Sequence, residues 1–212
     1  MRRRVYPASS TAPIAARPDW VFAYGSLMWN PGFATPETRP ARLPGWHRAF
    51  CIRSEHYRGT PENPGLILGL LPGGVCRGMV HRLPQDGYDL VRHYLWQREI
   101  LNDGVYVETV RPVVLSDGST VEALVYLANR SHLQYAGKLP QAEAVRLIRQ
   151  GVGTTGSNLD YLVNTVEQLE AHGFHDPSLH ALLMAVRSLP PEGEGGAPAP
   201  EGGCLRKHGG AC

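Results

Sequence analysis

Glu99 stands out among the acidic residues because helical spacing places it beside apolar side chains. In a helix that starts at Tyr88 and continues through Arg98, the positions Val91, Leu95 and Glu99 follow one another at i, i+4 and i+8. Partial burial and the negative end of a helix dipole both raise the pKa of a carboxyl group, which suits a proton shuttle near neutral pH. A buried acid is also commonly paired, and Arg98 is adjacent, so a structural ion pair is the alternative.

A second candidate is the segment "VFAYGSL" at residues 21–27, where an apolar strand stops on a glycine and a serine. Gly25 either ends the strand at a positive φ, or lets a ligand approach a backbone whose successive N–H groups bind an anion. Ser26 invites comparison with a hydrolytic nucleophile, yet "YGSLM" lacks the second glycine of G-x-S-x-G. This pattern alone does not decide between a structural hinge and a ligand-binding pocket.

Two further motifs favour structural interpretations. Residues 151–156, "GVGTTG", match G-x-G-x-x-G, but they follow a helical pattern where a dinucleotide site needs a preceding strand, so they predict a turn between helices. His172, His175 and His180 match no common zinc spacing and predict exposed histidines at helix ends. We therefore expect no metal site and no cofactor.

The elements that must position these residues are strands first and helices later. Turn signals at Pro72-Gly73-Gly74 and Asp117-Gly118 predict hairpins and antiparallel pairing. The predicted strands include residues 20–25, 46–53, 65–71 and 75–83, and further strands flank Asp117-Gly118. This order predicts an α+β domain with a small mixed or antiparallel sheet that curls into a barrel.

Helical periodicity dominates the second half. Apolar residues repeat at helical spacing from Leu159 to Leu169, after a capping-box-like pair formed by Ser157 and Asp160. Asp176 offers an N-cap with Pro177 at the first helical position of another helix. A shorter helix is predicted over 141–150 and an earlier one over 88–98.

Composition limits the classes of protein. The 212 residues carry a formal net charge of +2, which gives no strong field for nucleic acid or an anionic membrane. No apolar run reaches the roughly 20 residues that span a bilayer, and the start lacks a secretory apolar region. We therefore expect a cytoplasmic protein. Four cysteines without C-x-x-C spacing predict reduced thiols. Nothing in the sequence implies an obligate protein partner. We expect a flexible leader at 1–18, one domain at 19–189 and a disordered Gly/Pro-rich tail at 190–212.

Five segments together resemble the ChaC-like family of glutathione-specific γ-glutamylcyclotransferases over residues 19–189. They are "WVFAYGSLMWNPGF", "GWHRAFCIRSEHYRGTPENPGLILGL", "CRGMVHRL", "YLWQRE" and "GSNLDYLVNTVEQLEAHG". The resemblance implies a γ-glutamylcyclotransferase-like fold, a catalytic role for Glu99, and a substrate-binding segment made of Val21, Phe22, Ala23, Tyr24, Gly25, Ser26 and Leu27. Ala23 stands where many relatives have glycine.

The implied reaction cleaves glutathione to 5-oxoproline and cysteinylglycine by attack of the glutamyl α-amine on its own γ-carbonyl. Glu99 is expected to act as base and then acid, while N–H groups near Gly25 stabilise the oxyanion. Arg53 and Arg58 are candidates for binding the substrate carboxylates, although either one is equally suited to pair with Glu55 or Glu62.

Two other functions remain open from the sequence. One is cyclisation of other γ-glutamyl amino acids or amines, because the leaving-group side of the pocket is not visible in the motifs. The other is a non-catalytic regulatory binding protein of the same fold, which the presence of Glu99 disfavours. Tyr161 is either a cavity residue or a core tyrosine.

Overall fold

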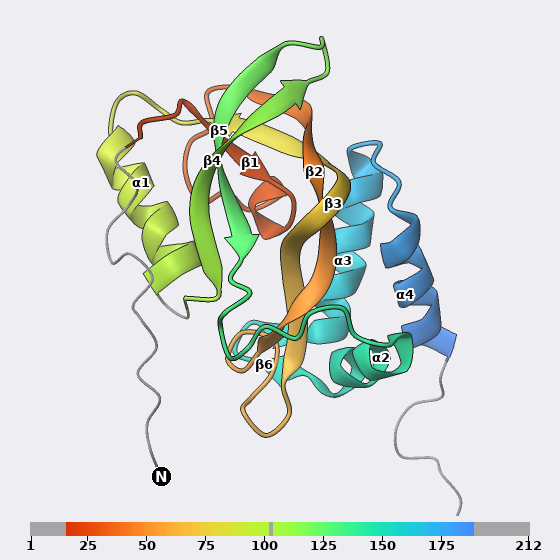
Figure 1. The fold of residues 1–212 in the computed structure, drawn as a ribbon. Helices are drawn as coiled ribbons and strands as arrows, with labels where there is room; N and C mark the ends of the chain where they lie inside the picture. The colour runs from red at the N-terminus through yellow and green to blue at the C-terminus, as the bar shows by residue number, and fades with distance from the viewer. Residues whose placement is uncertain (1–15, 102–103, 189–212) are drawn as a thin grey trace, which may run out of the picture.

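The computed structural model describes residues 16–101 and 104–188, and its centre is a closed five-stranded barrel (Figure 1). The strand order around the barrel is β1-β3-β2-β4-β5. The strands are β1 (Trp20–Ala23), β2 (Thr38–Ser54), β3 (Gly65–Arg82), β4 (Tyr106–Leu115) and β5 (Thr120–Ala128). The α+β fold with a barrel-like sheet is therefore confirmed.

The short strand β1 closes the barrel. It pairs antiparallel with β3, where Phe22 lies opposite Val80, and parallel with β5, where Trp20 lies opposite Ala123. All four of its residues are buried, as an apolar strand with neighbours on both sides requires. The mixed sheet therefore fixes the point at which the chain enters the Gly25 loop.

Strands β2 and β3 form one long hairpin, and the predicted turn at 72–74 is wrong. The chain continues through Gly73 and Gly74 as part of β3, with φ values of 102° and 75°. The pairing with β2 shifts there between Pro44 and Trp46, which marks a bulge. Glycines with positive φ bend a strand at a bulge as readily as they reverse it, so the local signal did not distinguish the two.

The predicted turn at Asp117-Gly118 is confirmed. It joins β4 to β5, Gly118 has a φ of 87°, and Oδ1 of Asp117 accepts a hydrogen bond from the Ser119 backbone N–H at 2.9 Å. The local aspartate bond and the permissive glycine stabilise this hairpin.

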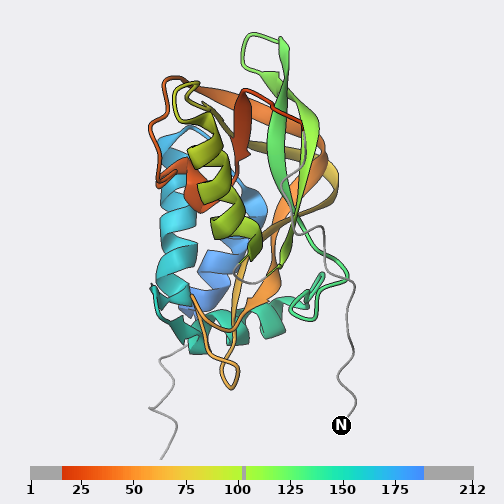
Figure 2. The ribbon, with the colours of Figure 1, turned by 90° about the vertical axis from the view of Figure 1, so that its left-hand side faces the viewer.

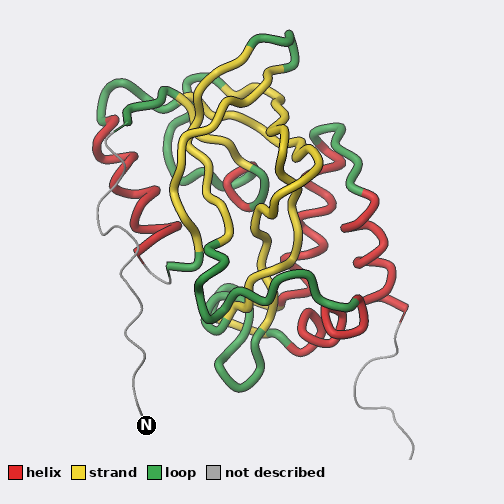
Figure 3. Tube along the Cα trace, in the orientation of Figure 1, coloured by secondary structure: helices red, strands yellow, loops and turns green. Residues whose placement is uncertain are grey.

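Four helices surround the barrel, with α1 on one side and α2, α3 and α4 on the other (Figure 1, Figure 2). Figure 3 shows the strands gathered at the centre with the helices outside them. The helices are α1 (Tyr88–Trp96), α2 (Gln141–Gln150), α3 (Asn158–Ala171) and α4 (Pro177–Ser188). The predicted helix over 141–150 is confirmed.

Both predicted N-caps in the second half are present. The Ser157 hydroxyl accepts a hydrogen bond from the Asp160 backbone N–H at 3.0 Å at the start of α3. Oδ1 of Asp176 accepts one from the Leu179 backbone N–H at 3.3 Å at the start of α4. Side-chain oxygens here satisfy N–H groups that a helix cannot bond internally.

Helix α1 ends earlier than predicted. After Trp96 the chain continues as a π-helical turn, η2 (Gln97–Leu101), which contains Glu99. The α-helical pattern placed Glu99 correctly near the core but missed this widening of the turn. Helix α1 is held to the barrel by Arg92, which makes a bidentate buried ion pair with Glu108 of β4 at 2.6 and 3.1 Å.

The G-x-G-x-x-G match lies in a turn between α2 and α3, as predicted, with the two-residue strands β6 (Val152–Gly153) and β7 (Gly156–Ser157). A Cβ on Gly151 would lie 2.4 Å from the Arg58 carbonyl oxygen, and one on Gly153 would lie 2.4 Å from the Tyr57 carbonyl carbon. The glycines are therefore required because the turn packs directly on backbone.

His172 and His175 are exposed, as predicted, whereas His180 lies inside α4 and is partly buried. Among the described residues no group of His, Cys, Asp and Glu is arranged to hold a metal, and no described helix is long and apolar enough to cross a membrane. The predicted tail at 190–212 and residues 1–15 of the predicted leader lie outside the described residues. Arg17 and Pro18, which were predicted to belong to the flexible leader, instead form hydrogen bonds with Asp89 and Tyr88 of α1.

Candidate active site

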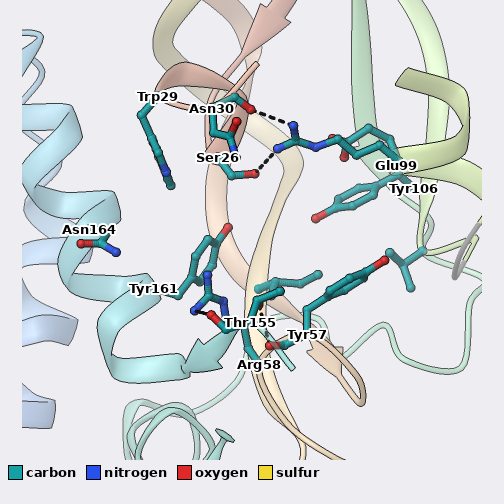
Figure 4. A pocket seen from close by; sticks show the side chains of 13 residues that line it. Ser26, Trp29, Asn30, Tyr57, Arg58, Glu99, Tyr106, Thr155, Tyr161 and Asn164 are labelled. Carbon is teal, nitrogen blue, oxygen red and sulfur yellow. Dashed lines mark hydrogen bonds and ion pairs between the residues drawn. The ribbon is translucent and has the colours of Figure 1, made fainter. Parts of the chain in front are cut away.

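A cavity of about 370 Å³ opens between the barrel, η2 and α3 (Figure 4). A smaller recess of about 30 Å³ shares Ser26, Glu99, Tyr106 and Tyr161 with it. The cavity is lined by Ser26, Trp29, Asn30, Tyr57, Arg58, Ile67, Arg98, Glu99, Val105, Tyr106, Thr155, Tyr161 and Asn164. The recess adds Tyr24, Gly25, Leu27, Leu68 and Tyr126. Glu99 and the glycine-serine turn therefore face a common space.

The glycine-serine turn begins a short 3₁₀ helix, η1 (Ser26–Met28), directly after β1. Gly25 has a φ of −141°, so it is not the positive-φ hinge that was one alternative. In the described part of the chain, the backbone N–H groups of Gly25, Ser26 and Leu27 have no intramolecular acceptor. The first N–H groups of a helix are free in this way, and here they border the recess.

The absence of a side chain at Gly25 keeps the recess open. A Cβ there would meet Cδ1 of Leu68 at 3.5 Å and the hydroxyl oxygen of Tyr161 at 3.7 Å, both residues of the recess. These are ordinary contact distances, so a methyl group would fit at this position, but it would fill part of the recess. The glycine therefore lets a ligand approach the backbone.

Buried polar groups hold the turn from behind. Nη1 of Arg48 donates to the Tyr24 carbonyl oxygen at 2.9 Å, and the Tyr24 hydroxyl donates to the Tyr126 carbonyl oxygen at 2.8 Å. Nε2 of His81 lies 3.0 Å from the Leu27 carbonyl oxygen, which requires that nitrogen to be the donor. The backbone on both sides of Gly25 is therefore fixed before any ligand binds.

Glu99 combines the two alternatives that the sequence left open. Its side chain is only 14% exposed, and Oε1 lies 3.1 Å from Nε of Arg98. Burial raises the pKa of the carboxyl group, and the charge and hydrogen bond of Arg98 offset only part of that rise. The acid is therefore paired with Arg98 and also faces the cavity with a proton affinity above that of an ordinary glutamate.

Aromatic residues make the recess a dry environment. The hydroxyl of Tyr106 donates to the Leu68 carbonyl oxygen at 2.7 Å. Burial raises the pKa values of Tyr24, Tyr106 and Tyr126 well above the ordinary range, and that of Tyr161 to about 12. These phenols stay neutral at physiological pH, which leaves Glu99, paired with Arg98, as the carboxyl group that lines the recess.

The two arginines proposed for substrate carboxylates lie in different places. Arg58 lines the cavity, its Nη1 donates to the carbonyl oxygens of Thr155 and Ser157 at 2.8 and 3.2 Å, and its guanidinium lies over the Tyr161 ring. No ion pair with a described carboxylate neutralises it. Arg58 thus presents an unneutralised charge to the cavity.

Arg53, in contrast, is not brought to the cavity. It lies in β2 opposite Leu66 of β3 and is not among the residues that line either space. The pKa of Glu143 in α2 is lowered chiefly by its hydrogen bond with Arg146 and slightly by the charge of Arg53, which places Arg53 towards α2. Neither Arg53 nor Arg58 forms the predicted alternative ion pair with Glu55 or Glu62 in the described chain.

The predicted segment 21–27 divides into lining and supporting residues. Tyr24, Gly25, Ser26 and Leu27 border the recess, whereas Val21, Phe22 and Ala23 are fully buried in β1 and support it from within the barrel. Sequence reasoning missed several lining residues, namely Trp29, Asn30, Tyr57, Tyr106, Thr155 and Asn164. Tyr57 carried a signal, because it lies in the same polar loop as Arg58, but Tyr106 looked like an ordinary strand residue.

Comparison with known proteins identifies relatives over most of the chain. A family model described as ChaC-like protein matches residues 19–189. The glutathione-specific gamma-glutamylcyclotransferase of Escherichia coli (strain K12) is 38% identical over 186 residues, which cover 86% of this chain and 80% of that protein. The protein of the same name from Schizosaccharomyces pombe is 32% identical over 184 residues, covering 78% of this chain and 89% of the relative.

Solved structures have the same fold. A crystal structure of a glutathione-specific gamma-glutamyl cyclotransferase from yeast superposes with a TM-score of 0.73 at 24% identity, covering 80% of this chain and 95% of that one. That likeness concerns the fold alone, whereas the family model and the relatives concern the sequence. The chain belongs to the ChaC-like protein family.

Proposed function

We propose that this protein is a glutathione-specific γ-glutamylcyclotransferase, which converts glutathione to 5-oxoproline and cysteinylglycine. The observation that carries the proposal is the meeting of the Glu99 carboxylate and the backbone of Gly25 and Ser26 at one small aromatic recess. The names of the relatives support the choice of substrate. The cavity that opens from the recess provides room for the dipeptide part of the substrate.

The first step needs a free amine. The α-amine of the γ-glutamyl group is protonated at neutral pH, and Glu99 removes one proton from it. The amine nitrogen then attacks the γ-carbonyl carbon of the same residue, and the carbonyl oxygen becomes an oxyanion. A carboxylate whose pKa is raised by burial is a better base than an exposed glutamate, and the charge and hydrogen bond of Arg98 offset part of that rise.

The second step needs an acid. The C–N bond to cysteinylglycine breaks as the oxyanion returns to a carbonyl, and Glu99 donates its proton to the departing amine. The carboxylate then takes the second proton from the ring nitrogen and passes it to that amine, so that 5-oxoproline leaves as a neutral lactam and cysteinylglycine as an ammonium. The donors for the oxyanion are proposed to be the unbonded N–H groups at Gly25, Ser26 and Leu27, and one such donor is worth about 3 kcal/mol. The reaction is intramolecular and balances without water or an oxidant.

The shape of the site favours a bent substrate. Ring closure requires the amine and the γ-carbonyl of one glutamyl group to approach each other, which a small recess enforces and an open groove does not. Arg58 lines the larger cavity but not the recess, so we assign it to a carboxylate of the leaving dipeptide. We prefer Arg58 to Arg53 because Arg53 is not among the residues that line the cavity.

The test is a product assay on the purified full chain with reduced glutathione. We expect 5-oxoproline and cysteinylglycine in equal amounts, and their absence would refute the proposal. Assays with γ-glutamyl-alanine and with oxidised glutathione test whether the site accepts other γ-glutamyl compounds. We place the enzyme in the cytoplasm, where thiols, including its substrate, are kept reduced.

A further inference from the structure

Arg98 makes more contacts than an ion pair with its neighbour requires. Its Nε lies 3.1 Å from Oε1 of Glu99. Nη1 donates to the Asn30 carbonyl oxygen at 2.7 Å and to the Tyr94 hydroxyl at 2.9 Å, and Nη2 donates to Oγ of Ser26 at 3.0 Å. One guanidinium therefore connects the acid in η2 with the loop that follows Gly25.

The shape of the guanidinium matters for this connection. Its donors lie in one plane at fixed angles, so a group that binds Glu99 through Nε and Ser26 through Nη2 sets the distance between those two residues. A lysine ammonium supplies the same charge from a single atom and cannot reproduce three separated contacts. Charge neutralisation alone would not need Arg98 to reach Ser26 and Asn30.

The contact with Arg98 also determines what the Ser26 hydroxyl can do. Arginine only donates hydrogen bonds, so Oγ of Ser26 is the acceptor from Nη2. The hydroxyl hydrogen is then free to point away from Arg98, and Ser26 borders both the recess and the cavity. Ser26 is thus arranged as a donor to an oxygen atom in the site rather than as a nucleophile, since its accepting lone pair faces a cation.

We propose that Arg98 is a positioning residue, which fixes the Glu99 carboxylate relative to the Ser26 loop and leaves the Ser26 hydroxyl as a hydrogen-bond donor to the substrate. The substrate contact rests on the proposed cyclisation. The connection between Glu99 and the loop belongs to the free protein and is testable without a substrate.

An electrostatic consequence follows from the groups around Glu99. Tyr24 at the end of β1, Tyr106 of β4, Tyr126 of β5 and Tyr161 of α3 face the same recess and stay neutral below about pH 10. Arg98 is the group whose charge lowers the pKa of Glu99 against the effect of burial. Loss of that charge must raise the pKa further, while a lysine at position 98 retains part of the effect.

The first experiment measures the titration of the Glu99 side-chain carboxyl by ¹³C NMR, without substrate, in the wild type, Arg98→Lys and Arg98→Met. We expect the pKa of Glu99 to be highest in Arg98→Met and closer to the wild-type value in Arg98→Lys. Equal pKa values in all three proteins would overturn the electrostatic role. If Arg98→Met does not fold, a comparison of Arg98→Lys with the wild type decides the point, because the displaced ammonium must still shift the titration.

The second experiment measures kcat and KM for glutathione in Arg98→Lys, Ser26→Ala and the double variant, with Arg39→Lys as the matched control. Arg39 pairs with Asp117 at the surface and lines neither the cavity nor the recess. A misplaced carboxylate costs about 10–100-fold in kcat, so we expect Arg98→Lys to lose that much. Both changes break the contact between Nη2 of Arg98 and Oγ of Ser26, while Ser26→Ala also removes the proposed donor to the substrate. The double variant should therefore lose less activity than the product of the two separate losses.

Each result is decisive for one of the two proposals. Full activity of Arg98→Lys, or independent losses that multiply in the double variant, would overturn the positioning role. A wild-type protein that makes no 5-oxoproline would refute the proposed function instead, and the NMR titration would still decide whether Arg98 controls Glu99. Unchanged melting temperatures separate both outcomes from a general loss of structure.

Discussion

Replacement of Glu99 by glutamine separates the chemical role of the carboxylate from its structural role. Glutamine has the same shape, and its carbonyl oxygen still accepts a hydrogen bond from Nε of Arg98, which lies 3.1 Å from Oε1 in the wild type. Arg98 also keeps its contacts with Ser26 and Asn30. The variant therefore preserves the cavity while it removes the only described carboxylate that lines it.

The expected loss of activity follows from the two proton transfers assigned to Glu99. General acid–base catalysis contributes about 10²–10⁴-fold, so kcat should fall at least a hundredfold, or about 2.7 kcal/mol in activation free energy. KM should change little, because the amide keeps the shape of the recess. The measurement is 5-oxoproline release under saturating glutathione, with Glu122→Gln on the exposed side of β5 as the control.

For the same variant, stability should change in the opposite direction to activity: Glu99→Gln should lose activity but should not lose stability at pH 8. Burial raises the pKa of Glu99 in the folded state above its unfolded value, so the native protein binds this proton more tightly. Its contribution to stability is present below the unfolded pKa and is lost as the pH rises through the folded pKa. At pH 8, Glu99→Gln should therefore be at least as stable as the wild type in urea unfolding, and this advantage should disappear in acid. Full activity, or a large loss of stability at pH 8, would refute the assignment.

Three other changes test the parts of the fold that support the site. Asn158→Ala removes both hydrogen bonds to the Leu66 backbone, each 2.6 Å long, and the two groups left unpaired should cost about 2–6 kcal/mol in urea unfolding; a smaller effect would mean that water replaces them. Gly153→Ala forces a Cβ to within 2.4 Å of the Tyr57 carbonyl carbon, so the loop that carries Arg58 should shift and KM for glutathione should rise, which steady-state kinetics would detect. Arg58→Met removes the cavity cation and should raise KM about tenfold or more with a smaller effect on kcat, whereas an unchanged KM would exclude it as a carboxylate partner.

Local signals predicted the local parts of this structure. Ser157 and Asp160 marked the start of α3 because a cap is a contact between residues three positions apart. The helix over 141–150 and the hairpin at Asp117-Gly118 depend equally on neighbouring residues. For the same reason, the glycines of 151–156 were correctly interpreted as a turn, since the preceding helical pattern excluded a strand.

The features that the sequence did not predict depend on residues far apart. Whether Gly73 and Gly74 reverse the chain or bend it depends on β2 continuing opposite them, which no local pattern reveals. Which of Arg53 and Arg58 lines the cavity depends on where β2 ends, because Arg53 lies in the strand and Arg58 in the loop that follows it. Tyr106 lines the cavity only because barrel closure brings β4 beside η2, so its type and spacing gave no sign of that role.

The closure of the barrel by β1 also has a consequence for how the chain folds. The hydroxyl of Tyr24 bonds to the Tyr126 carbonyl, 102 positions later, and β1 pairs in parallel with β5. Contacts of such long sequence separation form slowly, since a large loop must close before they contribute. Strand β1 is synthesised early, but it cannot complete its pairing until β5 has been synthesised. During synthesis on the ribosome, the enzyme should gain activity only after nearly the whole sheet has emerged. A nascent chain that ends before β5 should therefore not consume glutathione.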